Sequence, residues 1–336
     1  MKKVIFALAA VVALAACSNE EVIVADKGAA IGFDTFVENS TRAAQSTDPS
    51  LTVDKMKTTG FGVYGFVTNE VDDNDVTAPL FNNKQVKWTN GVWKYEGTQY
   101  WMDGATYDFA AIAPYGEYTV TAAAPTGVTL DFESDGVTDL LYAQNNEAPH
   151  TTVGFTFKHL LSKVKFTFTN GYDATNTVIA VKNIVINDAY SVGAAQLGRD
   201  ANGVTATWTP SSANLDLEFG DAVNADKYIA QGAKEESANA LLLIPSNTTY
   251  NVTFTIELLY HNGVDRYVKV KEYIHTVALT HNFEFGKSYN VATTINYTNI
   301  VPDDPSNPND NEQKPIEFTV TAIENWQDGT VGALPL

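Results

Sequence analysis

Short stretches of alternating polar and apolar residues recur along this chain. Residues 163–168 read Lys-Val-Lys-Phe-Thr-Phe, and residues 253–259 alternate in the same way. A period of two residues is typical of a β-strand with one buried and one solvent-facing side. The 3.6-residue period of an amphipathic helix is nearly absent. The pattern therefore predicts an all-β protein.

Strand-like segments rich in Val, Ile, Thr, Tyr and Phe are separated by turn signals such as Asn-Gly and Asp-Gly. A first segment covers residues 31–37, and others cover 61–68, 85–88, 92–95, 107–113, 153–157, 162–169, 178–186, 241–244, 250–260 and 267–277. The turn at Asn262 and Gly263 joins two long segments and predicts a hairpin. Many short strands of this kind favour antiparallel β-sandwiches over βαβ units, and the length of the chain predicts about two of them.

The first seventeen residues have the pattern of a lipoprotein signal peptide. Lys2 and Lys3 precede an apolar run at residues 4–13, and Leu-Ala-Ala at 14–16 ends at Cys17. The run is too short to be a permanent spanning helix. We expect residues 1–16 to be removed and an acyl chain on Cys17 to anchor the exported protein to a membrane. An ordinary secretory signal with an incidental cysteine is the alternative.

Composition narrows the function classes. The formal net charge is −19 with only 21 Lys and Arg, which argues against a nucleic-acid partner because phosphates attract basic faces. Cys17 is the only cysteine, so the sequence predicts no disulfide and no thiolate metal site. Hydrophobic residues make up 44% of the chain, enough to build a core without such cross-links.

A polar linker separates the last strand-like segment from the rest of the chain. Residues 302–315 contain four prolines and many Asp and Asn residues. Such a composition predicts an extended, solvated connection. Residues 316–323 then read Ile-Glu-Phe-Thr-Val-Thr-Ala-Ile, a hydrophobic strand with an unpaired backbone. We expect this strand to pair with the edge of a sheet, because an exposed edge promotes association.

Patterns of known catalytic or cofactor sites are weak. Gly60–Gly65 matches G-x-G-x-x-G but lies inside an aromatic strand rather than between a strand and a helix. None of the five histidines stands three to five residues from another, so no zinc motif is indicated, although distant histidines leave one open. Residues 72–75 lack the downstream Gly and Glu of a calcium loop. We therefore expect no cofactor and no metal, and we expect that the protein is not an enzyme.

Two carbohydrate-related alternatives remain open at this point. The 40 acidic residues leave a glycosidase carboxylate pair open, although no pair is singled out. Aromatic side chains could form a sugar-binding platform, although on strands they more often belong to a core: Trp88, Trp93, Trp101, Tyr95 and Tyr100. A surface-anchored glycan-binding lipoprotein is thus the main alternative function.

The order of these features resembles that of the Bacteroidetes fimbrillins, the type V pilin and Mfa-like family. The likeness covers nearly the whole chain. It rests on Thr41-Arg42-Ala43 after the Ile31-x-Phe33 strand, on the segment Phe-Lys-His-Leu-Leu-Ser-Lys-Val at 157–164, and on Ile-x-Phe-x-Val at 316–320 followed by Trp326.

The resemblance implies a fold and a sequence of assembly steps. The fold is two tandem antiparallel β-sandwich domains of transthyretin-like, Greek-key topology with a C-terminal donor strand. The precursor is a lipoprotein of the outer membrane, anchored only through the lipid on Cys17. An arginine-specific protease cuts after Arg42, so that Ala43 becomes the new N-terminus and the protein joins a surface fimbrium.

The same resemblance implies which strands are exchanged. The displaced strand contains Ile31, Phe33 and Val37. The donor strand of a neighbouring subunit contains Ile316, Phe318 and Val320. Both segments begin Ile-x-Phe, with apolar residues at alternate positions. Either segment can therefore fill the same pockets by β-strand addition, and the contact between different patches generates an open filament.

We therefore expect a structural subunit of a cell-surface fimbria that supports adhesion. Its partners are other pilin subunits, an arginine-specific protease and a host or bacterial surface ligand. The expected divisions of the chain are the signal peptide at 1–16, the lipidated propeptide with the first strand at 17–42, two β-sandwiches at 43–160 and 161–301, and the linker with donor strand at 302–336.

Overall fold

The computed structural model describes residues 29–37, 48–71, 74–116, 118–123, 127–145, 152–261, 263, 266–300 and 316–323. These residues form strands almost throughout, so the predicted all-β fold class is confirmed. The two helices in the described part are short, α1 (Val53–Thr59) and α2 (Tyr297–Ile300). Neither is long and apolar enough to cross a membrane.

The first half of the chain builds a seven-stranded sheet with the order β1-β9-β8-β5-β2-β3-β4. Its strands are β1 (Phe33–Val37), β2 (Phe61–Val71), β3 (Asn74–Thr89), β4 (Val92–Tyr95), β5 (Thr106–Ala113), β8 (Leu141–Asn145) and β9 (Val153–His159). In β9 the burial alternates strictly, with Val153, Phe155 and Phe157 inside. These side chains join an aromatic core that includes Phe61 and Phe109.

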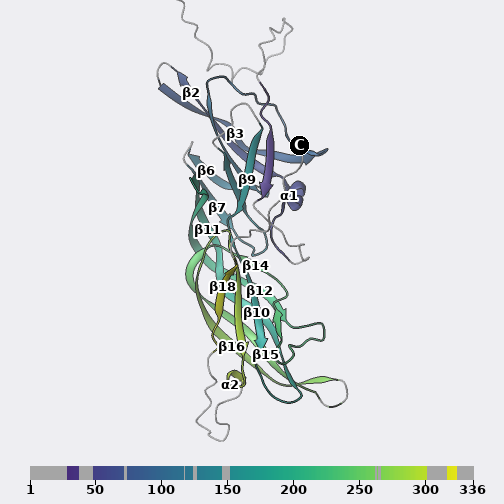
Figure 1. The fold of residues 1–336 in the computed structure, drawn as a ribbon. Helices are drawn as coiled ribbons and strands as arrows, with labels where there is room; N and C mark the ends of the chain where they lie inside the picture. The colour runs from purple at the N-terminus through teal and green to yellow at the C-terminus, as the bar shows by residue number, and fades with distance from the viewer. Residues whose placement is uncertain are drawn as a thin grey trace, which may run out of the picture.

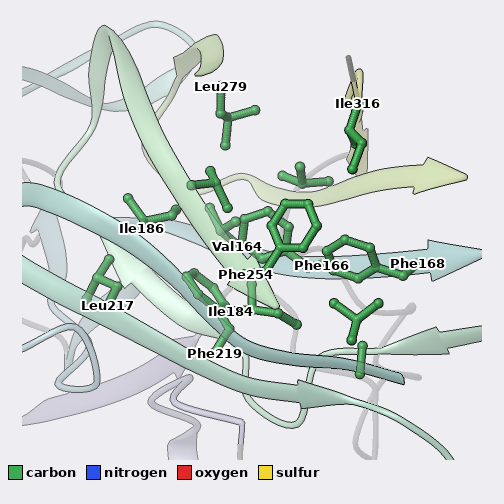
Figure 2. Packing of buried hydrophobic residues seen from close by; sticks show 14 of the residues in the cluster. Val164, Phe166, Phe168, Ile184, Ile186, Leu217, Phe219, Phe254, Leu279 and Ile316 are labelled. Carbon is green, nitrogen blue, oxygen red and sulfur yellow. The ribbon is translucent and has the colours of Figure 1, made fainter. Parts of the chain in front are cut away.

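The second half builds two sheets that face each other across a larger core. A five-stranded sheet contains β10 (Ser162–Asn170), β13 (Lys234–Glu236), β14 (Leu241–Leu243), β17 (Ser288–Ile295) and β18 (Thr319–Ile323). A six-stranded sheet contains β6 (Thr119–Ala123), β7 (Gly127–Glu133), β11 (Thr177–Asp200), β12 (Gly203–Ala222), β15 (Ser246–His261) and β16 (Tyr267–Phe283). Figure 2 shows the core between them, where Phe166, Phe168 and Phe254 gather.

The hairpin β6–β7 links the two halves. It comes from the first half of the sequence, yet β7 pairs with β11 over Val192–Leu197, within the sheet of the second half. A third core lies at this junction and includes Leu130, Tyr142 and Leu161. The molecule is accordingly elongated, with the seven-stranded sheet above and the β15–β16 hairpin below in Figure 1. The domain ranges 43–160 and 161–301 stay a prediction, since the halves share a sheet.

Two of the ladders are parallel, which differs from the expected purely antiparallel sandwiches. The strand β1 runs parallel to β9, and β10 runs parallel to β17. The members of each pair are far apart in the sequence, so a long connection is available, as parallel pairing requires. Local alternation does not reveal strand direction, because it reports only which side chains are buried.

The hairpins β6–β7 and β11–β12 were not fully expected from the sequence. Most side chains of β12 are exposed or half-buried, so it lacks the apolar alternation that identifies a strand. It forms because it pairs along β11 from Val181 to Asp200, with several register shifts. This is a case in which tertiary pairing overrides local pattern.

Candidate functional site

The first strand of the chain lies in a slot between two other segments. Residues 33–37 pair in parallel with residues 153–157 of β9. On its other side, the segment just before β1 pairs with residues 99–101: the N–H of Ile31 donates to the carbonyl of Gln99 at 2.9 Å, and the N–H of Trp101 donates to the carbonyl of Ala29 at 3.1 Å. Residues 29–37 therefore bridge β9 and the segment that follows β4. We call this bridged position the β1 slot.

Two apolar side chains of this strand point into the core. Ile31 is 2% exposed and Phe33 is 5% exposed. The ring of Phe33 stacks on that of Phe155 at 5.7 Å and meets Phe81 edge-on at 5.5 Å. Two of the three side chains predicted for the displaced strand, Ile31 and Phe33, are thus buried in the core of the seven-stranded sheet. Val37 lies in β1 opposite Phe157, and its side chain is outside the described set.

A tyrosine fastens the backbone of the strand. The hydroxyl of Tyr95 donates to the carbonyl of Ile31 at 2.9 Å and accepts from the N–H of Gln99 at 3.1 Å. Burial raises the pKa of the Tyr95 phenol, and the hydrogen bond from Gln99 opposes that rise. The phenol therefore keeps its proton at neutral pH and acts as a donor to the strand. Its ring also lies 5.4 Å from that of Phe33.

The third inward-facing side chain of the strand, that of Thr35, has a hydroxyl without a hydrogen-bond partner among the described residues. Thr35 is 5% exposed, and its Oγ1 is buried. Its backbone N–H turns to the side chain of Asp34 at 2.8 Å instead of to a neighbouring strand. A buried hydroxyl without a partner costs about 1–3 kcal/mol. The resident strand is therefore held by its first two inward side chains and weakened at its third.

The C-terminal strand pairs with its own domain in this structure. The strand β18 runs antiparallel to β17, from Thr319 opposite Ala292 to Ile323 opposite Ser288. Just before it, the hydroxyl of Thr293 donates to the carbonyl of Glu317 at 2.7 Å. The strand lies at the edge of the five-stranded sheet, so only one of its sides is paired among the described strands.

The predicted donor residues cover the lower core. Ile316 is 6% exposed, and Figure 2 places it at the margin of the cluster around Phe254. The ring of Phe318 meets those of Phe166, Phe168 and Phe254 at 5.7, 6.3 and 6.1 Å. Val320 is partly buried against the same cluster. The structure thus brings the three residues together as one apolar face, with the strand folded back onto its own chain.

A short segment before α1 clamps the junction between the halves. The N–H of Leu51 donates at 2.8 Å to Asp139, whose carboxylate lies 2.6 Å from Nδ1 of the buried His159. The ammonium of Lys163, on β10, contacts the carboxylate of Asp48 at 3.2 Å and the hydroxyl of Ser50 at 3.0 Å. The chain is therefore fixed again by residues 48–51, after the strand in the slot.

The charge of Asp48 depends on these contacts. Burial alone would raise the pKa of the Asp48 carboxyl, but hydrogen bonds from Ser50 and the charge of Lys163 outweigh it and lower the pKa. Asp48 also lines a cavity of about 560 Å³ with Asp135, Asp216 and Glu218. Among the described residues, no group of three or more His, Cys, Asp or Glu side chains is arranged to hold a metal ion.

The other predicted site residues lie outside the described part of the chain. Cys17, Arg42 and Ala43 belong to the ranges that the structure does not describe. Lipidation and proteolytic processing at these residues therefore stay predictions.

The aromatic residues considered as a sugar platform are mostly core residues. Trp93 is 9% exposed and Trp101 is 4% exposed. Trp88 packs edge-on against Trp93 at 5.2 Å, and Tyr95 lines the β1 slot. Only Tyr100 has substantial exposure, at 37%. These five side chains do not form one exposed face, because most of them are used in packing.

Comparison with known proteins settles the family. A model of the fimbrillin-like family matches residues 41–326, which is most of the chain. The protein belongs to the fimbrillin-like family. No curated protein matches the sequence. The family supports a role in fimbriae or cell adhesion at the cell surface.

Several solved structures are similar to this chain. A candidate cell adhesion protein of Bacteroides uniformis has 18% identity and a TM-score of 0.43, with 89% of this chain and 98% of that chain covered. One of Bacteroides ovatus has 17% identity and a TM-score of 0.43, with 90% and 99% covered. A candidate polysaccharide-binding protein of Bacteroides thetaiotaomicron has 11% identity and a TM-score of 0.34, with 80% and 92% covered.

Several residues of the slot were not identified from the sequence. Tyr95 and Gln99 contact the first strand across more than sixty positions of chain, and Thr35 is notable only because its hydroxyl is buried. Local pattern carries no signal for such long-range contacts. The repeated Ile-x-Phe was the one sequence signal that pointed to related strands.

Proposed function

We propose that this fimbrillin-like protein is a fimbrial subunit that polymerises by protease-triggered strand exchange and supports adhesion. The observation that carries the proposal is the position of residues 29–37. Their inward side chains fill pockets of the core, and the next described residues, 48–51, are anchored to the body by contacts of their own. A cut between these two anchors separates the strand from the body covalently while leaving every other described strand attached.

The predicted cleavage site lies in that interval. Arg42 stands between Val37 and Asp48, among small and polar residues that suit a protease cleft. After a cut there, the first strand would be held only by noncovalent contacts. The bonds that retain it are the β9 ladder, the pairing with residues 99–101 and the Tyr95 hydroxyl. Its release is then a matter of dissociation.

The replacement strand fits the same positions with one difference. Alignment of the two Ile-x-Phe patterns places Ile316 where Ile31 lies, Phe318 where Phe33 lies and Val320 where Thr35 lies. The donor therefore puts a methyl group where the resident strand buries a hydroxyl without a partner. This change favours exchange by about 1–3 kcal/mol. Burial of Ile316 and Phe318 in the slot adds little to this, because both side chains already pack against the core of their own domain.

The donor must first leave its own domain. Its ladder with β17 and the packing of Phe318 on Phe166 oppose release. Along Phe33–Val37 the slot offers one partner strand, as β17 does for β18, but it adds a second partner at residues 99–101 for the segment just before the strand. The cis position thus keeps the donor strand covered until a slot opens in another copy.

The proposed anchor and location follow the predicted signal. Acylation of Cys17 holds the precursor at the outer membrane, and cleavage after Arg42 frees the body from that lipid. Replacement of Cys17 by Ala should abolish fatty-acid labelling of the precursor. Equal fatty-acid labelling of the Cys17→Ala variant and the wild type would contradict acylation at Cys17.

The central test uses the precursor without its lipid. Cys17→Ala protein is incubated with an arginine-specific protease and examined by electron microscopy. Filaments are expected only after cleavage. Protein that is cleaved at Arg42 and retains residues 29–37 as a stable monomer contradicts strand exchange, because the open slot is the proposed source of polymerisation.

A further inference from the structure

Exposed large hydrophobic side chains gather at the lower end of the molecule. Of eleven such side chains in the described part of the chain, four lie near the turn of the β15–β16 hairpin: Tyr260, Tyr267, Val268 and Val270. Val270 is 64% exposed. A fifth, Tyr297, belongs to α2, which lies at the same end in Figure 1. We call these five residues the tip patch.

Two of the three tyrosines of the tip patch are held by ring contacts. Tyr267 lies 4.6 Å from Tyr228 and 5.1 Å from His261, ring centre to ring centre. Tyr297 stacks on Tyr172 at 5.4 Å. Rigid tyrosines lose little conformational entropy on binding and offer both an apolar face and a hydroxyl. The patch also lies along β16, an edge strand of its sheet. Its composition is that of a protein-binding surface.

A second group of exposed hydrophobic side chains lies on β4 and on the segment after it, which pairs with residues 29–31. Val92, Tyr100 and Met102 are 48%, 37% and 42% exposed. Within that segment, Tyr100 pairs with Ala30. We call these three residues the rim patch. The three remaining exposed side chains, Val76, Val137 and Ile274, belong to neither patch.

In the proposed exchange, the tip patch of one subunit and the rim patch of the next are connected by the segment that leads to the donor strand. The tip patch includes Tyr297 in α2, which ends at Ile300, and only residues 301–315 separate that point from Ile316. Fifteen residues span at most about 50 Å. A donor strand seated in the slot of another copy therefore tethers the tip patch of one subunit near the rim patch of the next. Tethering of this kind gives effective concentrations in the millimolar range, so a weak contact suffices.

We propose that the tip patch docks on the rim patch of the next copy of this chain. This inference rests on the proposed strand exchange and goes beyond it. The donor strand supplies attachment, and the docked patches fix the angle between successive subunits. Covering both patches also removes most of the exposed large hydrophobic side chains from water.

Cross-linking tests the contact directly. Cys17 is the only cysteine of the chain, so in the Cys17→Ala precursor an introduced thiol is unique. Precursors carrying Val270→Cys and Met102→Cys are mixed, cleaved with the arginine-specific protease and treated with a short bismaleimide. We expect a covalent dimer in the filament fraction and none before cleavage. The control pair, Val137→Cys with Met102→Cys, should give at least tenfold less product, because Val137 lies in neither patch.

A second experiment separates this inference from the proposed function. Val270→Glu should leave cleavage and release of the first strand unchanged but give filaments without a constant helical repeat, whereas Val137→Glu filaments should match the wild type. Wild-type filaments with no Val270–Met102 product overturn the docking contact and leave strand exchange standing. Filaments of Val270→Glu indistinguishable from those of Val137→Glu also overturn it, and point to another occupant of the tip patch. Failure of the cleaved wild type to polymerise overturns both.

Discussion

The hydroxyl of Tyr95 donates a hydrogen bond to the backbone carbonyl of Ile31 and so ties the first strand to the domain it completes. The two residues are 64 positions apart in the sequence. The same hydroxyl accepts a hydrogen bond from the N–H of Gln99. One side chain therefore holds both the first strand and the segment at residues 99–101 that pairs with its start. The strand is therefore retained by a small number of identifiable contacts, each of which can be removed.

Tyr95→Phe should accelerate release of the first strand after cleavage. The ring contacts with Phe33 remain, but the carbonyl of Ile31 and the N–H of Gln99 lose a partner, at a cost of about 0.5–1.5 kcal/mol each. Release is measured by mass spectrometry of the freed peptide. The matched control is Tyr118→Phe, which loses a bond to the carbonyl of Pro114 away from the slot. Equal release rates for wild type and Tyr95→Phe contradict the role of this bond.

Thr35→Val should have the opposite effect. It replaces a buried hydroxyl that has no partner in the described part of the chain by a methyl group, which stabilises the resident strand by about 1–3 kcal/mol. We expect release and filament growth to slow by about tenfold or more, since 1.4 kcal/mol corresponds to a factor of ten. Thr156→Val, at an exposed position of the neighbouring strand, serves as control. Faster growth of Thr35→Val filaments is the result that this explanation cannot accommodate.

Phe318→Asp should produce a subunit that accepts a strand but cannot donate one. A carboxylate at this position is buried among aromatic rings either in its own domain or in the slot of another copy, without a counter-charge. Added to growing wild-type filaments after cleavage, it should shorten them as a chain terminator. Thr319→Asp introduces the same charge at an exposed position and should leave filament length unchanged. Long filaments of pure Phe318→Asp protein argue against the donor assignment.

Arg42→Ala should accumulate a precursor that does not polymerise. The substitution removes the basic side chain that an arginine-specific protease requires while leaving the first strand in its slot. N-terminal sequencing of mature wild-type subunits should begin at Ala43. A mature N-terminus beyond Asp48 is incompatible with the proposed site, because residues 48–51 belong to the anchored body.

Acid should weaken the clamp at residues 48–51. The pKa of Asp48 is lower in the folded protein than the ordinary value of 3.8, so its charge stabilises the fold above that value. This stabilisation is lost as the pH falls through the folded pKa. Lys163→Met removes one of the lowering contacts, so the loss should begin at a higher pH and amount to less than about 1 kcal/mol. Urea unfolding between about pH 2 and 7 measures this loss. The control is Lys57→Met, which removes the exposed ion pair between Lys57 and Asp54. If the urea midpoint of Lys163→Met changes with pH in the same way as that of the wild type, the contact between Lys163 and Asp48 does not contribute to stability as proposed.

The sequence alone determined the fold class, and it identified the two related strands. Alternation of polar and apolar residues is a local property, so strands such as β9 and the hairpin β15–β16 were predictable from their own residues. The repeated Ile-x-Phe is local as well, because burial of alternate side chains depends on backbone geometry within one strand.

The tertiary structure decided where those strands lie and what holds them. The parallel pairing of β1 with β9, the contact of Tyr95 with Ile31 and the isolated hydroxyl of Thr35 each depend on segments that meet only in the folded chain. The same is true of the hairpin β6–β7, which pairs with β11 in the other half. Hydrogen bonding between strands is possible at many registers, and the packing of the complete core selects one, so these features have no counterpart in the pattern of a single segment.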